Sequence, residues 1–187
     1  RKRKFNMSWI EVETKIPFKE KDLISVRDRI KKIAKFIKKQ TKKDDYYTLE
    51  YFQYPEKSLR VRDMGKIREV NFKKRISFVN GIHAKKEVQF QISDIKGFFD
   101  LIEDFGFRKW LHKEKTTELY KTKSGVNIEL NHVKKLGWFL ELEVLCSNKE
   151  INNARKKIKE AREALGFSEK DSEVRGYTKQ LWGLNHK

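Results

Sequence analysis

The chain has 187 residues, of which 37% are hydrophobic and 39% charged, and its formal net charge is +18. Its apolar-periodic segments exclude a disordered polyelectrolyte, and no apolar run approaches the roughly 20 residues of a membrane helix. The single cysteine, Cys146, excludes an internal disulfide and suits a reducing compartment. We therefore expect one cytoplasmic domain over residues 1–187, without membrane contact.

The positive charge indicates an anionic partner without identifying it. A strongly basic protein attracts nucleic acid, acidic lipid or phosphorylated small molecules. Lysine-rich, solvated helix faces would give the same composition. Nucleic-acid binding through the basic surface is therefore one hypothesis, and a small polyphosphate ligand is another.

The first predicted element in chain order is a strand over residues 8–16, which Pro17 ends. Apolar residues at spacings of three and four then predict an amphipathic helix over residues 19–39. Residues 45–54 are aromatic and predict a second strand, which Pro55 ends.

A hairpin follows a short strand over residues 58–63. Strands over residues 66–79 and 82–92 are joined by Asn80-Gly81, which is the strongest short hairpin signal in a sequence. A helix is predicted over residues 94–104, beginning at a capping Ser-Asp pair.

Three more strands are predicted over residues 107–121, 125–132 and 137–146. A capping box then begins a helix over residues 148–165, and the tail from residue 171 holds a last short element. Seven or eight antiparallel strands with two or three helices make an α+β protein. So many strands in one small domain favour a closed barrel or a strongly curled sheet.

The strands carry charges of both signs on one face. In the first strand, Glu11, Glu13 and Lys15 share a face opposite Ile10 and Val12. Two arrangements satisfy the pattern: a flat sheet with its polar face in solvent, or a barrel with a polar lumen and helices over its apolar outside. We favour the barrel, because the polar faces contain many arginines and glutamates and few serines or threonines.

In such a barrel the charged side chains of both signs would share the lumen, where they must pair or bind a ligand. The inward basic residues would be Lys15, Arg60, Arg62, Lys73, Lys85, Lys113 and Lys115, and the inward acidic residues Glu11, Glu13, Glu87, Glu141 and Glu143. Paired carboxylates suit Mg²⁺ or Mn²⁺, and lysines with arginines clamp phosphate oxygens. A metal–polyphosphate complex would need both.

Several motifs, in order, resemble the CYTH superfamily, also called triphosphate tunnel metalloenzymes. The ExExK signature is present at residues 11–15, Leu-Arg-x-Arg at 59–62, and Leu-Gly-x-Phe-x-Glu-x-Glu at 136–143. Weaker matches are Asn71-Phe72-Lys73, Lys85-Lys86-Glu87, Lys113-Glu114-Lys115 and Tyr177. The resemblance covers about residues 9–182.

The resemblance implies an eight-stranded antiparallel β-barrel tunnel with flanking helices, and a role for each matching residue. Glu11, Glu13, Glu141 and Glu143 would hold Mg²⁺ or Mn²⁺, with Asn131 where the family usually has an aspartate. The triphosphate would be bound by Lys15, Arg60, Arg62, Lys73, Lys85, Lys113 and Lys115. Of these, Lys15 and Lys73 would be the catalytic residues.

The resemblance also leaves the reaction open. A class IV adenylyl cyclase, which makes cyclic AMP and pyrophosphate from ATP, is the first hypothesis. A triphosphatase that hydrolyses thiamine, inorganic or nucleoside triphosphate is an alternative, and so is a binder of nucleotide or polyphosphate without catalysis, which Asn131 favours. A monomer or a homodimer is expected.

Overall fold

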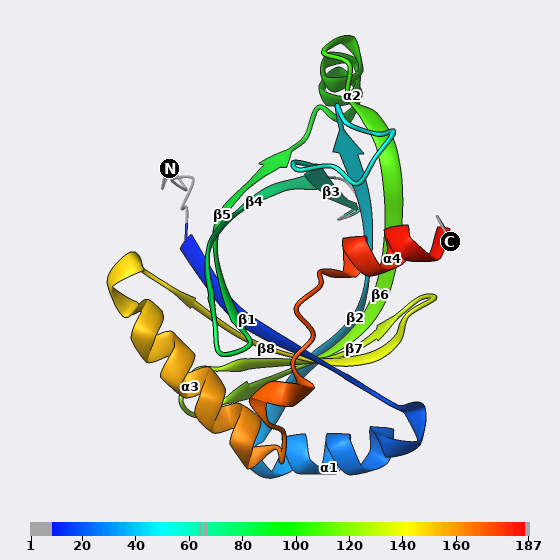
Figure 1. Cartoon of the computed structure of the whole chain (residues 1–187). Helices are drawn as coiled ribbons and strands as arrows, with labels where there is room; N and C mark the ends of the chain where they lie inside the picture. Colours follow the sequence, from blue (N-terminus) through cyan, green and yellow to red (C-terminus); the bar gives the residue numbers. More distant parts are fainter. Residues whose placement is uncertain (1–8, 64, 66, 186–187) are drawn as a thin grey trace.

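The computed structural model describes residues 9–63, 65 and 67–185. Eight strands close into an antiparallel barrel in the order β1-β5-β4-β3-β2-β6-β7-β8 (Figure 1). The strands are β1 (Trp9–Phe18), β2 (Ala34–Thr48), β3 (Leu59–Asp63), β4 (Arg68–Val79), β5 (Ile82–Ile92), β6 (Arg108–Thr122), β7 (Asn127–Val133) and β8 (Gly137–Cys146). The predicted barrel fold is confirmed.

Helices pack around the barrel, and the last of them lies across one of its ends (Figure 1). They are α1 (Leu23–Ile33), α2 (Ile95–Asp104), α3 (Ile151–Ala164) and α4 (Tyr177–Asn185), with 3-10 turns at Glu20–Asp22, Asn148–Glu150 and Glu169–Asp171. In the part of the chain that the structure describes, each helix is too short or too polar to cross a bilayer.

The main hydrophobic core lies between the barrel wall and helices α1 and α3. Val12 and Ile16 of β1 and Leu142 of β8 are fully buried, and they share this core with Ile30 of α1 and Ile158 of α3. Burial of one such side chain stabilises the fold by about 1.5–3 kcal/mol. Because alternate residues of a strand face opposite sides, this outward apolar core forces the intervening charged residues into the lumen.

Smaller cores lie under the other two helices. Phe98 and Phe99 of α2 pack with Val61 of β3 and Val70 of β4. On the other side of the barrel, α4 contributes Leu181 to a cluster with Tyr46, Leu111 and Trp110.

The Asn80-Gly81 hairpin is confirmed, and it also anchors the tail. Asn80 and Gly81 have φ of 52° and 76°, as the predicted turn requires. A Cβ at Gly81 would lie 2.7 Å from Oγ of Ser172, so the tail packs directly on the glycine. Thr14 Oγ1 donates a hydrogen bond of 2.8 Å to the Gly81 carbonyl, which ties the turn to β1.

The helix predicted over residues 19–39 is wrong in its second half. Helix α1 ends at Ile33, and β2 begins at the next residue. The first residues of β2 pair with β6, with Ala34 opposite Thr122, and the Phe36 ring meets Tyr120 at 5.4 Å and 73°. Pairing with a distant strand therefore overrides a helical pattern that continues through the lysines.

The aromatic strand predicted over residues 45–54 is displaced along the chain. It ends at Thr48, and residues 49–54 form a loop in which Tyr51 lies against Phe52. The strand instead extends back to Ala34, through lysines that the sequence analysis gave to a helix. The other predicted boundaries lie within a few residues, and the capping box between Ser147 and Glu150 is confirmed.

Candidate functional site

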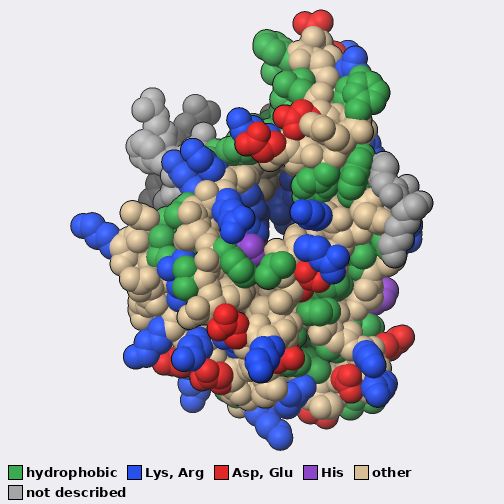
Figure 2. Space-filling model, viewed as in Figure 1, with side chains coloured by type: hydrophobic (Ala, Val, Ile, Leu, Met, Phe, Trp, Pro, Cys, Tyr) green, Lys and Arg blue, Asp and Glu red, His purple; other side chains and the backbone are tan. Residues whose placement is uncertain are grey.

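The barrel encloses one large cavity of about 790 Å³. Figure 2 shows one of its mouths, with Lys and Arg side chains around the opening. The predicted site residues that line the cavity are Glu11, Glu13, Lys15, Arg60, Arg62, Lys73, Lys85, Lys113, Lys115, Glu141 and Glu143. The predicted inward parity of β1, β3, β4, β5, β6 and β8 is confirmed.

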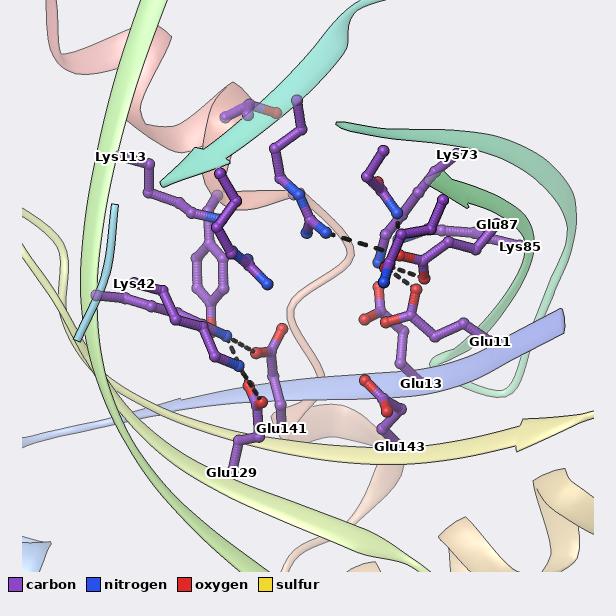
Figure 3. Close-up of a pocket in the computed structure, with 18 of the residues that line it drawn as sticks. Glu11, Glu13, Lys42, Lys73, Lys85, Glu87, Lys113, Glu129, Glu141 and Glu143 are labelled. Atoms are coloured by element: carbon purple, nitrogen blue, oxygen red, sulfur yellow. Dashed lines mark hydrogen bonds and ion pairs between the residues drawn. The ribbon is translucent and has the colours of Figure 1, made fainter. Parts of the chain in front are cut away.

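A first group of charges lies on β1, β4, β5 and β8 (Figure 3). The ammonium of Lys73 pairs with Glu11, and that of Lys85 pairs with Glu13. The strand register places Glu143 directly opposite Glu13. Two lysines thus hold two glutamates beside a third.

In this first group, the two lysines do not compensate the charge of all three glutamates. Burial raises the pKa of Glu11 well above its usual value, and so do the carboxylates of Glu13 and Glu143, against the effect of Lys73. Burial and Glu129 likewise raise the pKa of Glu143. Among the described residues, no lysine or arginine lies within ion-pair distance of Glu143, so this carboxylate is available to an added cation.

A second group, across the lumen, joins β2, β6, β7 and β8 (Figure 3). Lys115 Nζ lies 2.6 Å from Glu129 and 2.9 Å from Glu141. Lys42 Nζ lies 2.7 Å from the other oxygen of Glu129. Lys15 Nζ lies 3.6 Å from Glu141 and 4.3 Å from the centre of the Tyr177 ring.

A third group is centred on Asp44 of β2, which is fully buried. Arg62 donates two hydrogen bonds to its carboxylate, at 2.6 and 3.0 Å, and Lys113 Nζ lies 2.9 Å away. Although burial acts in the opposite direction, Lys113 and Arg62 lower the pKa of Asp44 far below its usual value. Asp44 therefore stays ionised and fixes the positions of Arg62 and Lys113, two side chains predicted to bind the triphosphate.

Four charged residues of the lumen and its wall were not predicted as site residues from the sequence: Lys42, Asp44, Glu69 and Glu129. Glu69 lies 3.4 Å from Arg60 and 3.6 Å from Arg62. Glu129 shares a strand face with Asn127, and this alternation was enough to predict that Glu129 points into the lumen. The inward position of Lys42 and Asp44 could not be predicted, because residues 40–44 were not assigned to any strand from the sequence.

Asn131 is fully buried and does not line the cavity. Its Oδ1 accepts a hydrogen bond of 2.6 Å from Thr117, and its Nδ2 donates one of 2.6 Å to Glu141 and one of 3.3 Å to Glu129. The amide thus serves as a neutral donor between two carboxylates, and its role as a metal ligand stays a prediction.

Replacing this donor by a carboxylate should destabilise the metal-free protein. In Asn131→Asp, a third negative charge would face Glu141 and Glu129, so we expect a loss of about 2 kcal/mol or more in unfolding free energy. Urea denaturation measures the loss, and added Mn²⁺ should reduce it. Asn127→Asp is the matched control, because Asn127 is partly exposed and its contact to Glu143 is longer, at 3.3 Å. Equal stability of Asn131→Asp and wild type would contradict this assignment.

The tail crosses one end of the barrel and meets His83 there. The His83 Nε2 lies 3.2 Å from the Val174 carbonyl, and the Glu173 amide donates a hydrogen bond of 2.7 Å to the Lys15 carbonyl. Burial, followed by the nearby Lys85, lowers the pKa of His83 from 6.5 to about 4.

Because the pKa of His83 is lowered in the fold, we expect the stability of the folded protein to fall in acid. Because the unfolded chain binds a proton that the fold excludes, His83 should contribute stability above about pH 6.5 and lose it as pH falls towards 4. Thermal melting across this range should show a steeper loss for wild type than for His83→Gln. Parallel curves for wild type and His83→Gln would contradict the prediction.

The carboxylates of the first group fit a divalent metal in donor chemistry. Their oxygens are the ligands that Mg²⁺ and Mn²⁺ prefer. Burial first, and then the neighbouring carboxylates, raise the pKa values of Glu11 and Glu143, and a bound cation would favour the ionised form of both. Across residues 9–63, 65 and 67–185, no three acidic, histidine or cysteine side chains converge in the manner of a formed metal centre. Lys73 and Lys85 hold two of the carboxylates instead.

Comparison with known families decides the relationship. The profile of the CYTH domain matches residues 9–177, which includes all eight strands. The chain belongs to the CYTH family. The resemblance found in the sequence is thereby confirmed, and the lumen described above is the CYTH tunnel. No curated protein sequence matches the chain significantly.

Solved structures agree with this fold. Two proteins of Pyrococcus horikoshii are 27% and 25% identical to this CYTH chain, with TM-scores of 0.72 and 0.74. The alignments cover 90% and 93% of this chain and 98% and 99% of theirs. A Hippeastrum protein, provisionally assigned as an adenylyl cyclase and described as having a dominant triphosphatase activity, is 15% identical, with 96% of both chains covered and a TM-score of 0.65. At that identity the likeness shows the fold alone.

Proposed function

We propose that this CYTH protein is a divalent-metal-dependent enzyme that binds a triphosphate in its tunnel and breaks one phosphorus–oxygen bond. The observation that carries the proposal is one enclosed cavity that holds buried lysines and arginines together with Glu143, a carboxylate without a cationic partner among the described residues. Buried charges are costly unless they pair or bind a ligand, and a metal–triphosphate complex complements both signs. Enzymes of the CYTH family act with divalent metal ions.

The basic residues would bind and orient the phosphate chain. Arg62 offers a planar fork, and Asp44 already holds its orientation through two hydrogen bonds. Lys113 and Lys15 lie at 5.6 and 4.3 Å from the Tyr177 ring, so both ammonium groups border the same end of the cavity. Phosphoryl transfer depends mainly on such positioning and charge neutralisation, which these residues supply.

Glu11, Glu13 and Glu143 would hold the metal, with Glu141 adjacent. A bound Mg²⁺ or Mn²⁺ would neutralise charge on the phosphate oxygens and activate a nucleophile. Lys73 and Lys85 now pair with Glu11 and Glu13, and both could instead donate to phosphate once a cation compensates these carboxylates. We assign Lys73 and Lys15 as the catalytic lysines, because each lines the cavity and pairs there with a carboxylate, Lys73 with Glu11 and Lys15 with Glu141.

Two reactions share this clamp. In the cyclase reaction, the ribose 3′ oxygen attacks the α-phosphorus, its proton is lost and pyrophosphate leaves. In the hydrolase reaction, water attacks the terminal phosphorus and the bond to the bridging oxygen breaks. We favour the cyclase as the first candidate, because the length of the chain and the sequences of its strand motifs most resemble that subgroup. Triphosphate hydrolysis is the second, and the activity described for the Hippeastrum protein of this fold favours it.

Product analysis tests the proposal. The protein is incubated with ATP, thiamine triphosphate or inorganic triphosphate, with Mg²⁺ or Mn²⁺ and with a chelator, and the products are separated. Cyclic AMP with pyrophosphate would identify the cyclase, whereas phosphate with a diphosphate would identify the hydrolase. Tight binding without turnover in either metal would indicate the non-catalytic binder. The proposal would be refuted if the protein neither bound nor turned over any of the three compounds.

A further inference from the structure

Helix α2 projects from the barrel and carries exposed apolar side chains (Figure 1, Figure 2). Ile102 is buried in the core beneath the helix, whereas Leu101 is 56% exposed and Phe105 is 70% exposed. The Phe105 amide donates a hydrogen bond of 3.1 Å to the Leu101 carbonyl, so the helical turn continues as far as Phe105. Residues four apart lie on the same side of a helix, and the two apolar side chains therefore form one exposed stripe.

The stripe ends in a gap at Gly97, one turn before Leu101. The Gly97 amide donates a hydrogen bond of 2.9 Å to the Asp94 carboxylate, which caps the helix. A side chain at Gly97 would clash with that carboxylate, so the cap favours glycine here. The stripe thus has an exposed ring at one end and no side chain at the other, about 12 Å apart for eight helical residues.

Leu49 extends the apolar surface beyond the end of the helix. It is 57% exposed, and a Cβ at Gly106, the residue after Phe105, would lie 3.7 Å from its Cδ2. Exposed apolar side chains gathered in one place mark an interaction surface more often than isolated ones do. Leu49, Leu101 and Phe105 do not line the tunnel cavity, so this surface is separate from the proposed active site.

The charges on α2 restrict the kind of partner. Asp100, Glu103 and Asp104 make this helix acidic within a chain of net charge +18. Lys96 pairs with Asp100, while the carboxylates of Glu103 and Asp104 have no ion pair within the described ranges of the chain. Nucleic acid and anionic lipid carry the same sign as these carboxylates, so the surface repels both. A basic protein fits this surface, and another copy of this chain is such a protein.

The order of the charges along α2 favours another copy of the chain. Lys96 lies in the first turn and Asp104 is the last helical residue, and Asp100 joins them in one row at spacings of four. When two such helices pack antiparallel, this row meets its own copy in the reverse direction, so Lys96 faces the partner's Asp104. The same reversal brings Phe105 over the partner's Gly97, where no side chain occupies the space. Charge and shape are therefore both self-complementary.

We propose that two copies of this chain associate through α2, antiparallel about a two-fold axis that passes beside Leu101. A two-fold contact uses the same surface on both copies, so it gives a closed dimer and no larger assembly. A helix of ten residues is about 15 Å long, which places the contact among interfaces that bury less than about 1,200 Å². We expect a reversible dimer with a dissociation constant between about 1 μM and 1 mM. The inference goes beyond the proposed function and does not depend on it.

Sedimentation equilibrium from about 1 μM to 1 mM protein tests the inference. Wild type should show a monomer–dimer equilibrium. Leu101→Lys should weaken the dimer about tenfold or more, because it puts two like charges at the centre of the contact. Ile24→Lys is the matched control and should leave the dimer unchanged, since Ile24 is 71% exposed on α1. Thermal melting should show that both variants are folded, because both side chains are exposed.

Further variants test the antiparallel arrangement. Asp104→Lys should weaken the dimer, because Lys96 would then face a like charge, and adding Lys96→Glu should restore it. Leu101→Cys should form a disulfide-linked dimer on mild oxidation, because a residue beside a two-fold axis lies next to its own copy. Ile24→Cys should not form one. Both cysteine variants retain Cys146, so the background oxidation is the same.

Three outcomes would overturn the proposal. Wild type that stays monomeric throughout the range would mean that a different partner covers α2. A dimer that Leu101→Lys leaves intact would show that another surface holds the two copies together. If Lys96→Glu failed to restore the dimer of Asp104→Lys, the antiparallel packing on which the proposal rests would be wrong.

Discussion

Asp44→Asn should lower the unfolding free energy by about 3–5 kcal/mol, the usual loss when one partner of a buried ion pair is removed. The fully buried carboxylate compensates Arg62 and Lys113 together, so its neutralisation leaves two cations in the barrel wall without a full counter-charge. Urea denaturation at neutral pH measures the change.

Asp45→Asn is the matched control for this experiment. Asp45 is the next residue along β2, points outward, and pairs at the surface with Lys109 at 2.8 Å and His112 at 2.6 Å. Solvent-exposed pairs contribute about 1 kcal/mol or less, so this variant should remain close to wild type. Equal losses of unfolding free energy in the two variants would show that the buried pairs of Asp44 stabilise the fold no more than the surface pairs of Asp45.

Asp44→Asn should also weaken triphosphate binding, because Arg62 would lose the two hydrogen bonds that orient its fork. Loss of a group that orients a ligand-binding side chain typically costs about 10–100-fold. We expect this loss in the binding constant, with Asp45→Asn unchanged. A stable Asp44→Asn protein with full affinity would remove Asp44 as a positioning residue.

Glu143→Gln should lose nearly all metal-dependent turnover and yet unfold at an equal or higher temperature than wild type. Burial and neighbouring carboxylates raise the pKa of Glu143, so its ionised form is disfavoured in the fold, and a neutral amide removes that cost. The same change removes a carboxylate that we assign to the metal. A fall of about 10²–10³-fold in kcat is expected for the loss of one such electrostatic group.

Glu129→Gln provides the opposite control. Although burial acts to raise it, Lys115 and Lys42 hold the pKa of Glu129 well below its usual value. Neutralising Glu129 would therefore leave two lysines short of a counter-charge, and we expect a loss of about 3–5 kcal/mol. If Glu143→Gln were the less stable of the two, or were fully active with Mg²⁺, the metal-side assignment would be wrong.

Such a contrast is typical of functional sites. Side chains that bind a ligand are often held in arrangements that the free protein disfavours, and substituting them can stabilise the fold while removing activity. In this tunnel, Asp44 and Glu129 are compensated by the protein itself, whereas Glu143 lacks a cationic partner among the described residues. Stability and activity measured on the same variants would separate the structural charges from the functional ones.

On most strands, the side chains that enter the lumen could be predicted from the amino-acid pattern. The strict alternation in β1 and β8 turns Glu11 and Glu143 inward once Val12 and Leu142 are buried, and the Asn80-Gly81 turn fixes the hairpin between β4 and β5. These are local properties, set by the two-residue period of a strand and by turn geometry. These features could therefore be predicted before any tertiary contact was known.

The course of β2 and the choice of charge partners depend instead on contacts between distant segments. Residues 34–44 have no strand pattern of their own and become a strand because β6 supplies hydrogen-bond partners, which brings Lys42 and Asp44 into the site. Whether a lumen lysine meets Glu129 or Glu141 depends on the register around the closed barrel. Coulomb attraction acts through space between distant strands, so the sequence specifies the charges and the closure of the barrel specifies their pairs.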